Sequence, residues 1–450
     1  MERNLKGNRY PGVSRRQFLK QSSAIGAVAA VGFPNVTGAV AGSDEIRVGV
    51  IGCGGRGTGA ALNVLQVPTE VIYPPPRNGY HTEDAVPGSQ VGVKGIKVVA
   101  LADLFRDRLE ECRTQLRNVG NDVPDDRCFV GWDAYQALID LDDVNYVILA
   151  TPPYYRPKEL HACVDAGKHV FMEKPVAVDS PGVRSIIESG EAAKKKSLGI
   201  AAGTLRRHQA DIIETVRRLH EGAIGEIYQA RAYFNIGEIW MIPREDGWSD
   251  MEWQQRNWPY YTWLSGDIIV EQHIHMIDMI NWIMDANPVK AYGMGGRLAR
   301  PGEEYGHIYD HFAIEYEYAN GAMFFSQNRQ IENCANRISA AVLGSKGRSN
   351  GENQISGLTE WQYEGKVRDA YEQEHINLID SIRRGEPINE ARQVAESTLT
   401  GIMGRDSCYS GDEITWEAAL NSKRVFGPNE LKFGPLELPE VPTPRNFEFE

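Results

Sequence analysis

A loop with the spacing Gly-x-Gly-x-x-Gly directly follows an apolar segment, residues 46–51, and opens a segment of helical pattern. In such a loop the glycines allow a tight turn, let a pyrophosphate approach the backbone and keep the helix close to the strand. The positive end of the helix then faces the phosphates. The sequence therefore predicts a dinucleotide site in this loop, which consists of Gly52, Cys53, Gly54, Gly55, Arg56 and Gly57.

An acidic residue, Asp103, ends the second expected strand, residues 96–102. A carboxylate at this place accepts hydrogen bonds from both ribose hydroxyls and repels a 2′-phosphate, which favours NAD over NADP. It follows Gly57 by 46 residues instead of the usual ~20, because a Pro- and Gly-rich stretch, residues 68–95, intervenes as an expected long loop. Asp103 would equally serve as the cap of a helix beginning at Leu104. Arg56 is an argument for NADP instead, because a basic side chain in the loop suits a phosphate.

Strands and helices alternate through the first part of the chain, which predicts parallel βαβ units. The second half is different: four segments rich in aromatic and branched residues predict a largely antiparallel sheet, with a hairpin at Asn320-Gly321. The expected strands are residues 46–51, 96–102, 144–150, 169–172, 198–203, 224–237, 289–298, 310–318 and 322–331. The expected helices are residues 58–66, 104–119, 157–166, 373–384 and 390–403.

The bulk composition excludes some classes of function. A chain of 450 residues is long enough for two domains, and its net charge of −13 disfavours nucleic acid as a partner, because phosphates would be repelled. None of the six cysteines has the spacing of a metal knuckle, so neither a metal site nor a disulfide framework is expected.

The N-terminus has the layout of a twin-arginine export signal. Arg15 and Arg16 precede an apolar run, residues 24–31, and then the cleavage site Ala39-Val40-Ala41. The alternative is a disordered basic terminus. The run is too short and too rich in Ala and Gly to span a bilayer, so we expect no stable membrane span. The expected partner is the twin-arginine translocase, and the expected location is the periplasm or another exported site.

Residues 166–175, which end in Glu173-Lys174-Pro175, resemble the Gfo/Idh/MocA oxidoreductases. The resemblance covers essentially the whole mature chain, including the glycine loop, Asp103 and Thr151-Pro152-Pro153. It implies an α/β fold, with an N-terminal Rossmann domain (a doubly wound parallel sheet) and a C-terminal α/β domain on a large open sheet. It also implies that Thr151 and Pro152 contact the cofactor, that Glu173 and Lys174 lie beside the nicotinamide, and that Pro175 follows a cis bond.

A second signature carries the candidate acid–base residues. Residues 271–278 align with the family pattern Asp-x-Gly-x-His-x-x-Asp, with Glu271 in place of the first Asp and His273 in place of Gly. His275 matches the catalytic histidine of the family, and an imidazole titrates near neutrality. Lys174 ends a strand, where it can exchange a proton with a sugar hydroxyl as hydride moves, although it could instead be a surface lysine paired with Glu173.

Substrate contacts are expected from His275, from Arg207, which follows the strand at 198–203, and from Tyr155, which follows the strand at 144–150. An aromatic cluster at residues 258–263 either stacks on a pyranose or only packs the linker. The expected divisions of the chain are a signal peptide, a Rossmann domain, a substrate and oligomerisation domain, and C-terminal helices with a tail packing back on both domains. Their bounds are residues 1–41, 42–175, 176–365 and 366–450.

The leading hypothesis is an exported NAD-dependent oxidoreductase acting on a secondary hydroxyl of a sugar or glycoside. Because little free NAD exists outside the cytoplasm, the nucleotide is expected to be tightly held and recycled within each turnover. The alternative is an NAD-dependent glycosidase that works by transient C3 oxidation and elimination, like the α-N-acetylgalactosaminidase group. A third possibility, a non-catalytic sugar-binding module, conflicts with the presence of both Lys174 and His275. The resemblance also implies a homo-oligomer, a dimer or tetramer.

Overall fold

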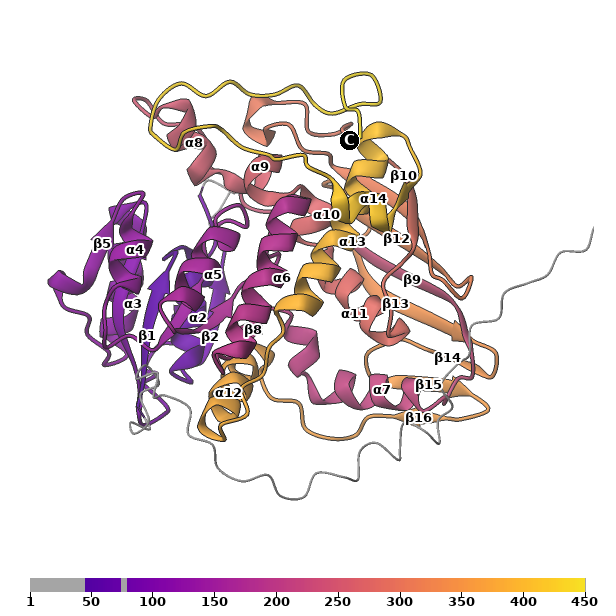
Figure 1. Cartoon of the computed structure of the whole chain (residues 1–450), viewed down its shortest axis with the longest axis horizontal. Coiled ribbons are helices and arrows are strands. Elements are labelled where there is room, and N and C mark those ends of the chain that lie inside the picture. The colour runs from indigo at the N-terminus through magenta and orange to yellow at the C-terminus, as the bar shows by residue number, and fades with distance from the viewer. Residues whose placement is uncertain (1–44, 74–78, 450) are drawn as a thin grey trace, which may run out of the picture. The chain divides into compact units, whose positions relative to one another are not determined.

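Two large sheets organise the chain (Figure 1). The computed structural model describes residues 45–73 and 79–449, so the export signal and cleavage site expected within residues 14–41 lie outside the described residues. A six-stranded parallel sheet is followed by a nine-stranded, mostly antiparallel sheet, which confirms the expected fold class. Among the described residues, no helix combines the length and apolar character that crossing a membrane requires.

The first sheet has the strand order β5-β4-β1-β6-β7-β8, and every neighbouring pair is parallel. The order reverses between β1 and β6, and ligands of doubly wound sheets bind at this point, beyond the carboxyl ends of the strands. The strands are β1 (Ile46–Ile51), β4 (Ile96–Asp103), β5 (Cys128–Val130), β6 (Tyr146–Leu149), β7 (His169–Met172) and β8 (Ile200–Ala202).

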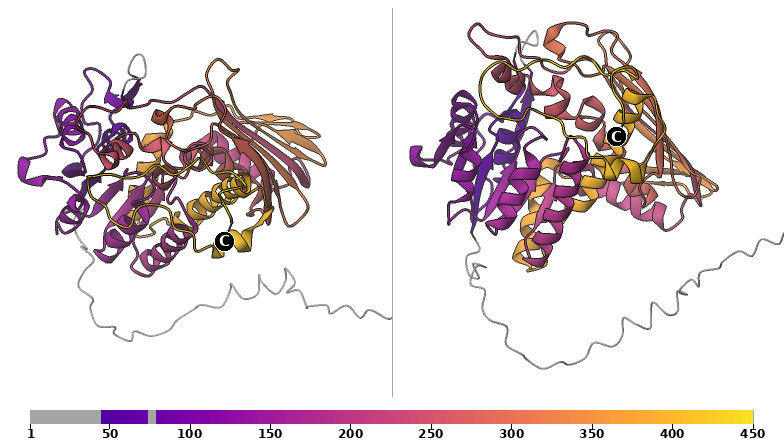
Figure 2. Two further views of the ribbon diagram at one scale, coloured as in Figure 1. Left: turned by 90° about the horizontal axis from the view of Figure 1, so that it is seen from above. Right: turned by 45° about the horizontal axis from the view of Figure 1, so that its top comes forward.

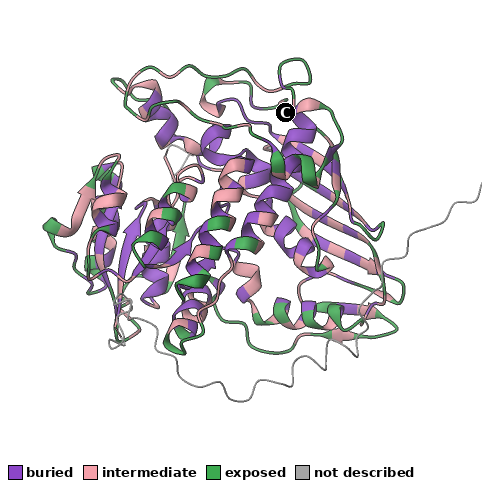
Figure 3. Cartoon of the chain, in the orientation of Figure 1, coloured by how far each residue is buried: buried purple, intermediate pink, exposed green. Residues whose placement is uncertain are grey.

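Helices cover both faces of this sheet, which explains why its strands are almost continuously apolar (Figure 3). Leu62, Leu116 and Leu378 represent the three helices packed on one face. These helices are α2 (Gly55–Val64), α3 (Arg106–Asn118) and α12 (Ala370–Arg383). The other face is covered by α4 (Ala134–Ile139), α5 (Arg156–Asp165) and α6 (Ser180–Lys195).

The first sheet is completed by residues far along the chain. The last strand, β8, lies beyond residue 175, where the sequence placed the end of the N-terminal domain. Residues 388–390 then line the edge of β8, because the Ile200 N–H donates to Ile388 O and the Glu390 N–H donates to Ile200 O, both at 2.9 Å. On the sheet face, the Tyr146 hydroxyl lies 2.8 Å from His375 Nδ1 of α12.

The long loop expected over residues 68–95 is a wrong prediction in part. Within it, β2 (Thr69–Ile72) and β3 (Thr82–Ala85) form an antiparallel pair. Both strands are short and lie in a Pro- and Gly-rich context, which hides the alternation of polar and apolar residues typical of a strand. The pair is fixed to the nucleotide loop through Glu83, whose Oε2 lies 2.6 Å from Arg56 Nη1.

The second sheet has the order β16-β15-β14-β13-β9-β12-β11-β10-β17 and contains one parallel pair, β9 with β12. The hairpin predicted at Asn320-Gly321 is confirmed, since β11 and β12 pair across this turn and Gly321 has a φ of +82°. The strands are β9 (Ile227–Ile236), β10 (Lys290–Gly296), β11 (His311–Glu317), β12 (Met323–Gln330), β13 (Arg337–Gly344), β14 (Gly347–Ser349), β15 (Gln354–Gly357), β16 (Trp361–Gln362) and β17 (Ile414–Thr415).

Helices pack on one face of the second sheet, and the views in Figure 2 show none over the other. Tyr292 and Met294 on the uncovered face are 55% and 68% exposed. The helices of this half are α7 (Ala210–His220), α8 (Asp250–Arg256), α9 (Thr262–Ser265), α10 (Ile268–Glu271), α11 (Ile274–Met284), α13 (Ala391–Ser410) and α14 (Trp416–Asn421). After α14, residues 422–449 run without helix or strand.

Candidate nucleotide and substrate site

The glycine loop is shaped by close approaches that exclude side chains. Gly52 has a φ of +92°, and a Cβ there would lie 2.6 Å from the backbone of Thr151, so the loops after β1 and β6 pack backbone to backbone. At Gly54 a Cβ would meet nothing within 4 Å, which leaves open space beside the N-terminus of α2. This space fits a pyrophosphate held by the helix N-terminus.

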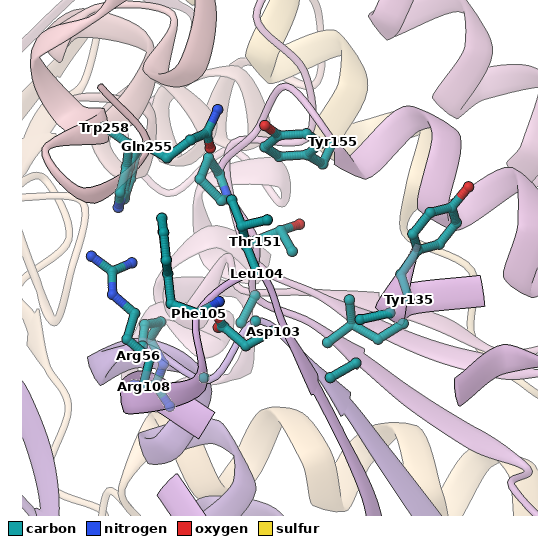
Figure 4. Close-up of a pocket in the computed structure, with 18 of the residues that line it drawn as sticks. Arg56, Asp103, Leu104, Phe105, Arg108, Tyr135, Thr151, Tyr155, Gln255 and Trp258 are labelled. Atoms are coloured by element: carbon teal, nitrogen blue, oxygen red, sulfur yellow. Dashed lines mark hydrogen bonds between the residues drawn. The ribbon is translucent and has the colours of Figure 1, made fainter. Parts of the chain in front are cut away.

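A cavity of about 920 Å³, open solvent included, extends from this loop across the carboxyl ends of β4 and β6 (Figure 4). It brings together most of the predicted cofactor residues: Gly52, Gly54, Gly55, Arg56, Gly57, Asp103, Thr151 and Pro152. Cys53, Glu173 and Lys174 do not line it. Cys53 is buried behind the loop and contributes its backbone N–H to Asp103 instead.

Residues from two other parts of the chain, most of which the sequence did not indicate, form further walls of the cavity. Tyr80 and His81 come from the insertion that carries β2 and β3, while Trp240, Gln255 and Trp258 come from the second half of the chain. Figure 4 shows Gln255 and Trp258 on one side of the pocket and Asp103 and Phe105 on the other. Only Trp258 had been singled out, as part of the aromatic cluster; the others carry no recognisable local pattern.

Asp103 is held in place by backbone donors on two loops. Its Oδ2 accepts the Cys53 N–H at 2.6 Å and its Oδ1 accepts the Phe105 N–H at 2.7 Å, just before α3 begins. Burial raises the pKa of Asp103. A carboxylate has about four acceptor positions, so these two bonds leave capacity for ribose hydroxyls. The predicted cap of a helix beginning at Leu104 is wrong, because α3 begins at Arg106 and its N-cap residue is Phe105. The ribose role of Asp103 stays a prediction.

Arg56 faces carboxylates. Its Nε lies 3.1 Å from Glu173 Oε1 and its Nη1 2.6 Å from Glu83 Oε2, and its guanidinium stacks 4.5 Å from the centre of the Tyr371 ring. Burial opposes the charged form, but Glu83 and Glu173 outweigh it and raise the pKa of Arg56. Burial likewise opposes ionisation of Glu83, yet Arg56 and His81 lower the pKa of that carboxyl. Arg56 thus links the glycine loop to the insertion and to the end of β7.

Lys174 and Glu271 meet across the two halves of the chain. The Lys174 ammonium donates to the backbone oxygen of Glu271 at 2.8 Å and to its Oε1 at 3.0 Å. The predicted cis bond before Pro175 is confirmed. The alternative pairing of Lys174 with Glu173 is not found, since Glu173 Oε2 accepts only the backbone N–H of Lys174, at 3.2 Å.

His275 stands in the first turn of α11, next to this pair. Its Nδ1 is buried and has no hydrogen-bond partner among the described residues. Burial, followed by the charges of Lys174 and Arg206, lowers the pKa of His275 well below 6.5. Its imidazole is therefore neutral at pH 7 and can accept a proton, the property needed in a general base.

His273, which stands where the family has glycine, has a different environment. Its Nε2 lies 2.7 Å from Ser326 Oγ of β12, and burial lowers the pKa of the imidazole to about 3. A neutral ring thus fills the space between α11 and the second sheet.

Arg207 is engaged by the protein itself. Its Nε and Nη2 donate to the Asp278 carboxylate at 2.8 and 3.0 Å, and its guanidinium lies 5.0 Å from the centre of the Trp282 ring. Asp278 also accepts the Ser397 hydroxyl at 2.7 Å. The structure thus places Arg207 where it fixes α11, the helix of His275.

Tyr155 lines the nucleotide cavity, and its hydroxyl is buried. In the aromatic cluster, Tyr260, Tyr261 and Trp263 are at most 5% exposed and pack the interior, whereas Trp258 reaches the cavity. The packing interpretation therefore holds for three of these four residues.

A buried carboxylate, Glu159 of α5, also lines the cavity and was not expected from the sequence. Its Oε2 accepts the Thr151 hydroxyl at 2.5 Å, and burial raises the pKa of Glu159 to about 7. Arg156 in the same turn donates to Thr151 O at 2.5 Å and to Pro175 O. Burial lowers the pKa of Arg156 to about 10. Thr151 is thereby held from two sides.

Curated proteins of related sequence include dehydrogenases and glycosyl hydrolases. A relative, myo-inositol 2-dehydrogenase from Thermotoga maritima, is 24% identical over 76% of this chain and 90% of its own length. A glycosyl hydrolase family 109 protein from Shewanella is 24% identical over 52% of this chain and 49% of its length. The chain spans about half the length of several curated relatives, such as 46% of an uncharacterized oxidoreductase from Streptococcus pneumoniae.

Solved structures share the fold. A myo-inositol 2-dehydrogenase from Lactobacillus plantarum superposes with a TM-score of 0.59 at 18% identity, over 82% of this chain and 99% of that one. The family model described as "Oxidoreductase family, NAD-binding Rossmann fold" matches residues 46–203, and "GFO/IDH/MocA C-terminal domain" matches residues 213–349. The two family models, one for each half of the architecture, place the chain in the Gfo/Idh/MocA family of oxidoreductases.

Proposed function

We propose that this protein is an exported, NAD-dependent oxidoreductase that acts on a secondary hydroxyl of a sugar or glycoside. The carrying observation is the convergence of a neutral histidine, His275, and the Lys174–Glu271 pair at the carboxyl end of β7. A hydride transfer from a CH–OH group needs a base for the hydroxyl proton and a donor for the developing charge on oxygen. Relatives named as inositol dehydrogenases support this substrate class.

The residues divide the work as follows. NAD, held by the glycine loop and Asp103, would supply the hydride acceptor. In the oxidising direction His275 takes the hydroxyl proton through its ring nitrogen, while the Lys174 ammonium donates a hydrogen bond to the same oxygen. Glu271 orients Lys174, and Arg207 orients α11 through Asp278. In the reducing direction His275 returns the proton.

The preference for NAD over NADP rests on two features. Asp103 places a carboxylate where the adenosine ribose of a bound dinucleotide belongs, and it would repel a 2′-phosphate. Arg56, the cation that would attract such a phosphate, is already neutralised by Glu83 and Glu173. Binding titrations with both nucleotides test this: tighter binding of NADP than of NAD contradicts it.

The walls of the cavity support a retained, recycled nucleotide. A dinucleotide in it would be enclosed by the insertion residues Tyr80 and His81 and by Trp240, Gln255 and Trp258 from the second half of the chain. Release therefore requires contacts between the two halves to open. A protein that retains its nucleotide needs no supply of free NAD after export. We expect stoichiometric NAD in the purified protein, measured by absorbance after denaturation.

A redox glycosidase is the second candidate, and the glycosyl hydrolase family 109 relatives favour it. The same base and the same retained nucleotide would serve transient oxidation at C3, elimination of the aglycone, addition of water and reduction. One incubation with nitrophenyl glycosides and free pyranoses, without added nucleotide, separates the two. Repeated nitrophenolate release without lasting NADH absorbance indicates the glycosidase; NADH that reverses with a keto-sugar indicates the oxidoreductase.

We also propose a homo-oligomer formed through the uncovered face of the second sheet, where Tyr292 and Met294 are exposed. Light scattering of the purified protein tests this, since Tyr292→Glu with Met294→Glu should yield monomers. Export is tested by fractionating cells that express the full chain, with Arg15→Lys and Arg16→Lys as the control expected to retain the protein in the cytoplasm.

A further inference from the structure

The segment after α14 forms a strap that crosses α8 (Figure 1); we define the strap as residues 423–441. Three hydrogen bonds attach it to α8. The Met251 N–H donates to Gly434 O at 3.1 Å, the Leu436 N–H donates to Asp250 Oδ2 at 3.1 Å, and Gln254 Nε2 donates to Leu436 O at 3.2 Å. The strap therefore follows α8 closely, although it has no regular structure of its own.

One side chain of the strap reaches the nucleotide domain. The Phe433 ring centre lies 5.2 Å from that of Trp132 and 6.1 Å from that of Phe105. Phe105 and Trp132 both line the nucleotide cavity, and Phe105 follows Asp103 by two positions. Phe433 thus braces, from outside, the wall behind the expected ribose site. Its ring remains 46% exposed, so this contact contributes little to any larger hydrophobic core.

The helix under the strap holds the same wall from another direction. The Arg256 guanidinium lies 3.8 Å from the centre of the Phe105 ring, and its Nη1 lies 2.8 Å from Asp107 Oδ2. Arg108 Nη2 donates to the backbone oxygen of Arg256 at 3.0 Å, and Gln255 lines the cavity itself. The strap, α8 and the Phe105 wall consequently form one continuous set of contacts around one end of the cavity.

We infer that Phe433 is a positioning residue for the nucleotide, and that the strap is a clasp whose release sets the rate at which the nucleotide leaves. This inference rests on the proposed function, because it concerns the dinucleotide held in the same cavity. Departure requires α8 to separate from the Phe105 wall, and the strap spans that separation. Losing the aromatic contacts of Phe433 should raise the off-rate about tenfold, which corresponds to about 1.4 kcal/mol.

The experiment measures dissociation of NADH from the full protein. Protein carrying NADH is mixed with a large excess of NAD, and the loss of bound NADH fluorescence gives the off-rate. Phe433→Ala should raise the off-rate about tenfold while leaving the thermal midpoint nearly unchanged, and Phe433→Trp should restore the slow rate. The control is Val425→Ala on the same strap, whose side chain is 69% exposed; its off-rate should equal that of the unaltered protein.

Three results would overturn the inference in distinguishable ways. If the unaltered protein retains NADH and Phe433→Ala releases it equally slowly, the clasp is wrong and the proposed function stands. If the unaltered protein binds neither NADH nor NAD, the proposed function fails and the clasp fails with it. An off-rate raised equally by Val425→Ala also contradicts a specific role for Phe433, since it would indicate general loosening of the strap.

Discussion

The ammonium of Lys174 donates to two oxygens of Glu271, the backbone oxygen at 2.8 Å and the carboxylate Oε1 at 3.0 Å. The backbone bond would survive any change of the Glu271 side chain, whereas the carboxylate bond would not. The ion pair between them is 14–15% exposed, so its charges are only partly screened by water. Glu271 therefore orients the Lys174 ammonium. Variants of the Glu271 side chain can test the effect of this orientation while Lys174 itself remains in place.

Replacing Glu271 should lower turnover in two steps. In Glu271→Gln the amide oxygen and the backbone oxygen both remain acceptors, so kcat should fall less than tenfold. In Glu271→Ala only the backbone bond remains, and kcat should fall about 100-fold, at the lower end of the range for acid–base groups. Steady-state kinetics checks this, with the sugar identified by the incubation with nitrophenyl glycosides and free pyranoses. An unchanged kcat in both variants would show that Glu271 has no orienting role.

Replacing His275 should abolish most of the activity, and the pH profile of the unaltered protein should reveal the low pKa of this imidazole. Because burial first, and then Lys174 and Arg206, lower the pKa of His275, the neutral base persists below pH 6.5. The acid limb of the oxidation rate should therefore lie below pH 6.5, and His275→Ala should reduce kcat/KM by about 10²- to 10⁴-fold. His161, whose side chain is 67% exposed, offers a control, since His161→Ala should leave the pH profile unchanged.

Glu159 should make the protein less stable as pH rises. Burial raises the pKa of Glu159 from 4.5 to about 7, with Arg156 and Lys158 opposing and Asp103 adding to the shift. Between these pH values the folded state keeps a proton that the unfolded chain has lost, so stability falls with rising pH and levels off above about pH 7. Glu159→Gln should therefore stabilise the protein by about 3 kcal/mol at pH 8 and by much less at pH 5.

Urea unfolding at both pH values measures this effect of Glu159. The exposed Glu417→Gln serves as the control and should change neither value. A gain for Glu159→Gln that is the same at pH 5 and pH 8 would mean that the buried proton is not the cause.

Arg56 should be essential for stability, because it compensates two buried carboxylates at once. Arg56→Met leaves Glu83 and Glu173 without their cation, and breaking a buried pair in this way costs about 3–5 kcal/mol. The loss should shrink as pH falls, since the unpaired carboxyls then take up protons. Urea unfolding of Arg56→Met and of the double variant with Glu83→Gln checks this, and the double variant should recover part of the loss.

The sequence predicted the features whose causes are local. The glycine loop, the strand ending at Asp103 and the cis bond before Pro175 depend on neighbouring residues or on a family signature. What it missed depends on distant partners. Arg207 follows a strand, as predicted substrate ligands often do, yet its partner Asp278 comes from a helix 71 positions later. Trp240 and Gln255 reach the cavity only because the second half of the chain folds over it, and the pKa of Glu159 is raised only because the folded domain buries this carboxyl.

Helix boundaries show the same division between local and distant causes. The helix predicted at residues 390–403 continues to Ser410, because Cys408 and Tyr409 are buried against the second sheet and the tail. A single-sequence pattern carries no information about such late contacts. The β2–β3 pair was missed for a similar reason, since its anchor, Glu83, matters only once Arg56 lies opposite.

The position of α12 on the first sheet has a consequence for synthesis. Leu378 and Ile379 complete the face that carries Tyr146 and Phe171, so that face stays open to water until residue 383 has left the ribosome. At about 5–20 residues per second, the roughly 180 residues after β8 take on the order of 10–35 s. The nascent nucleotide domain therefore spends that interval with an apolar surface exposed to water.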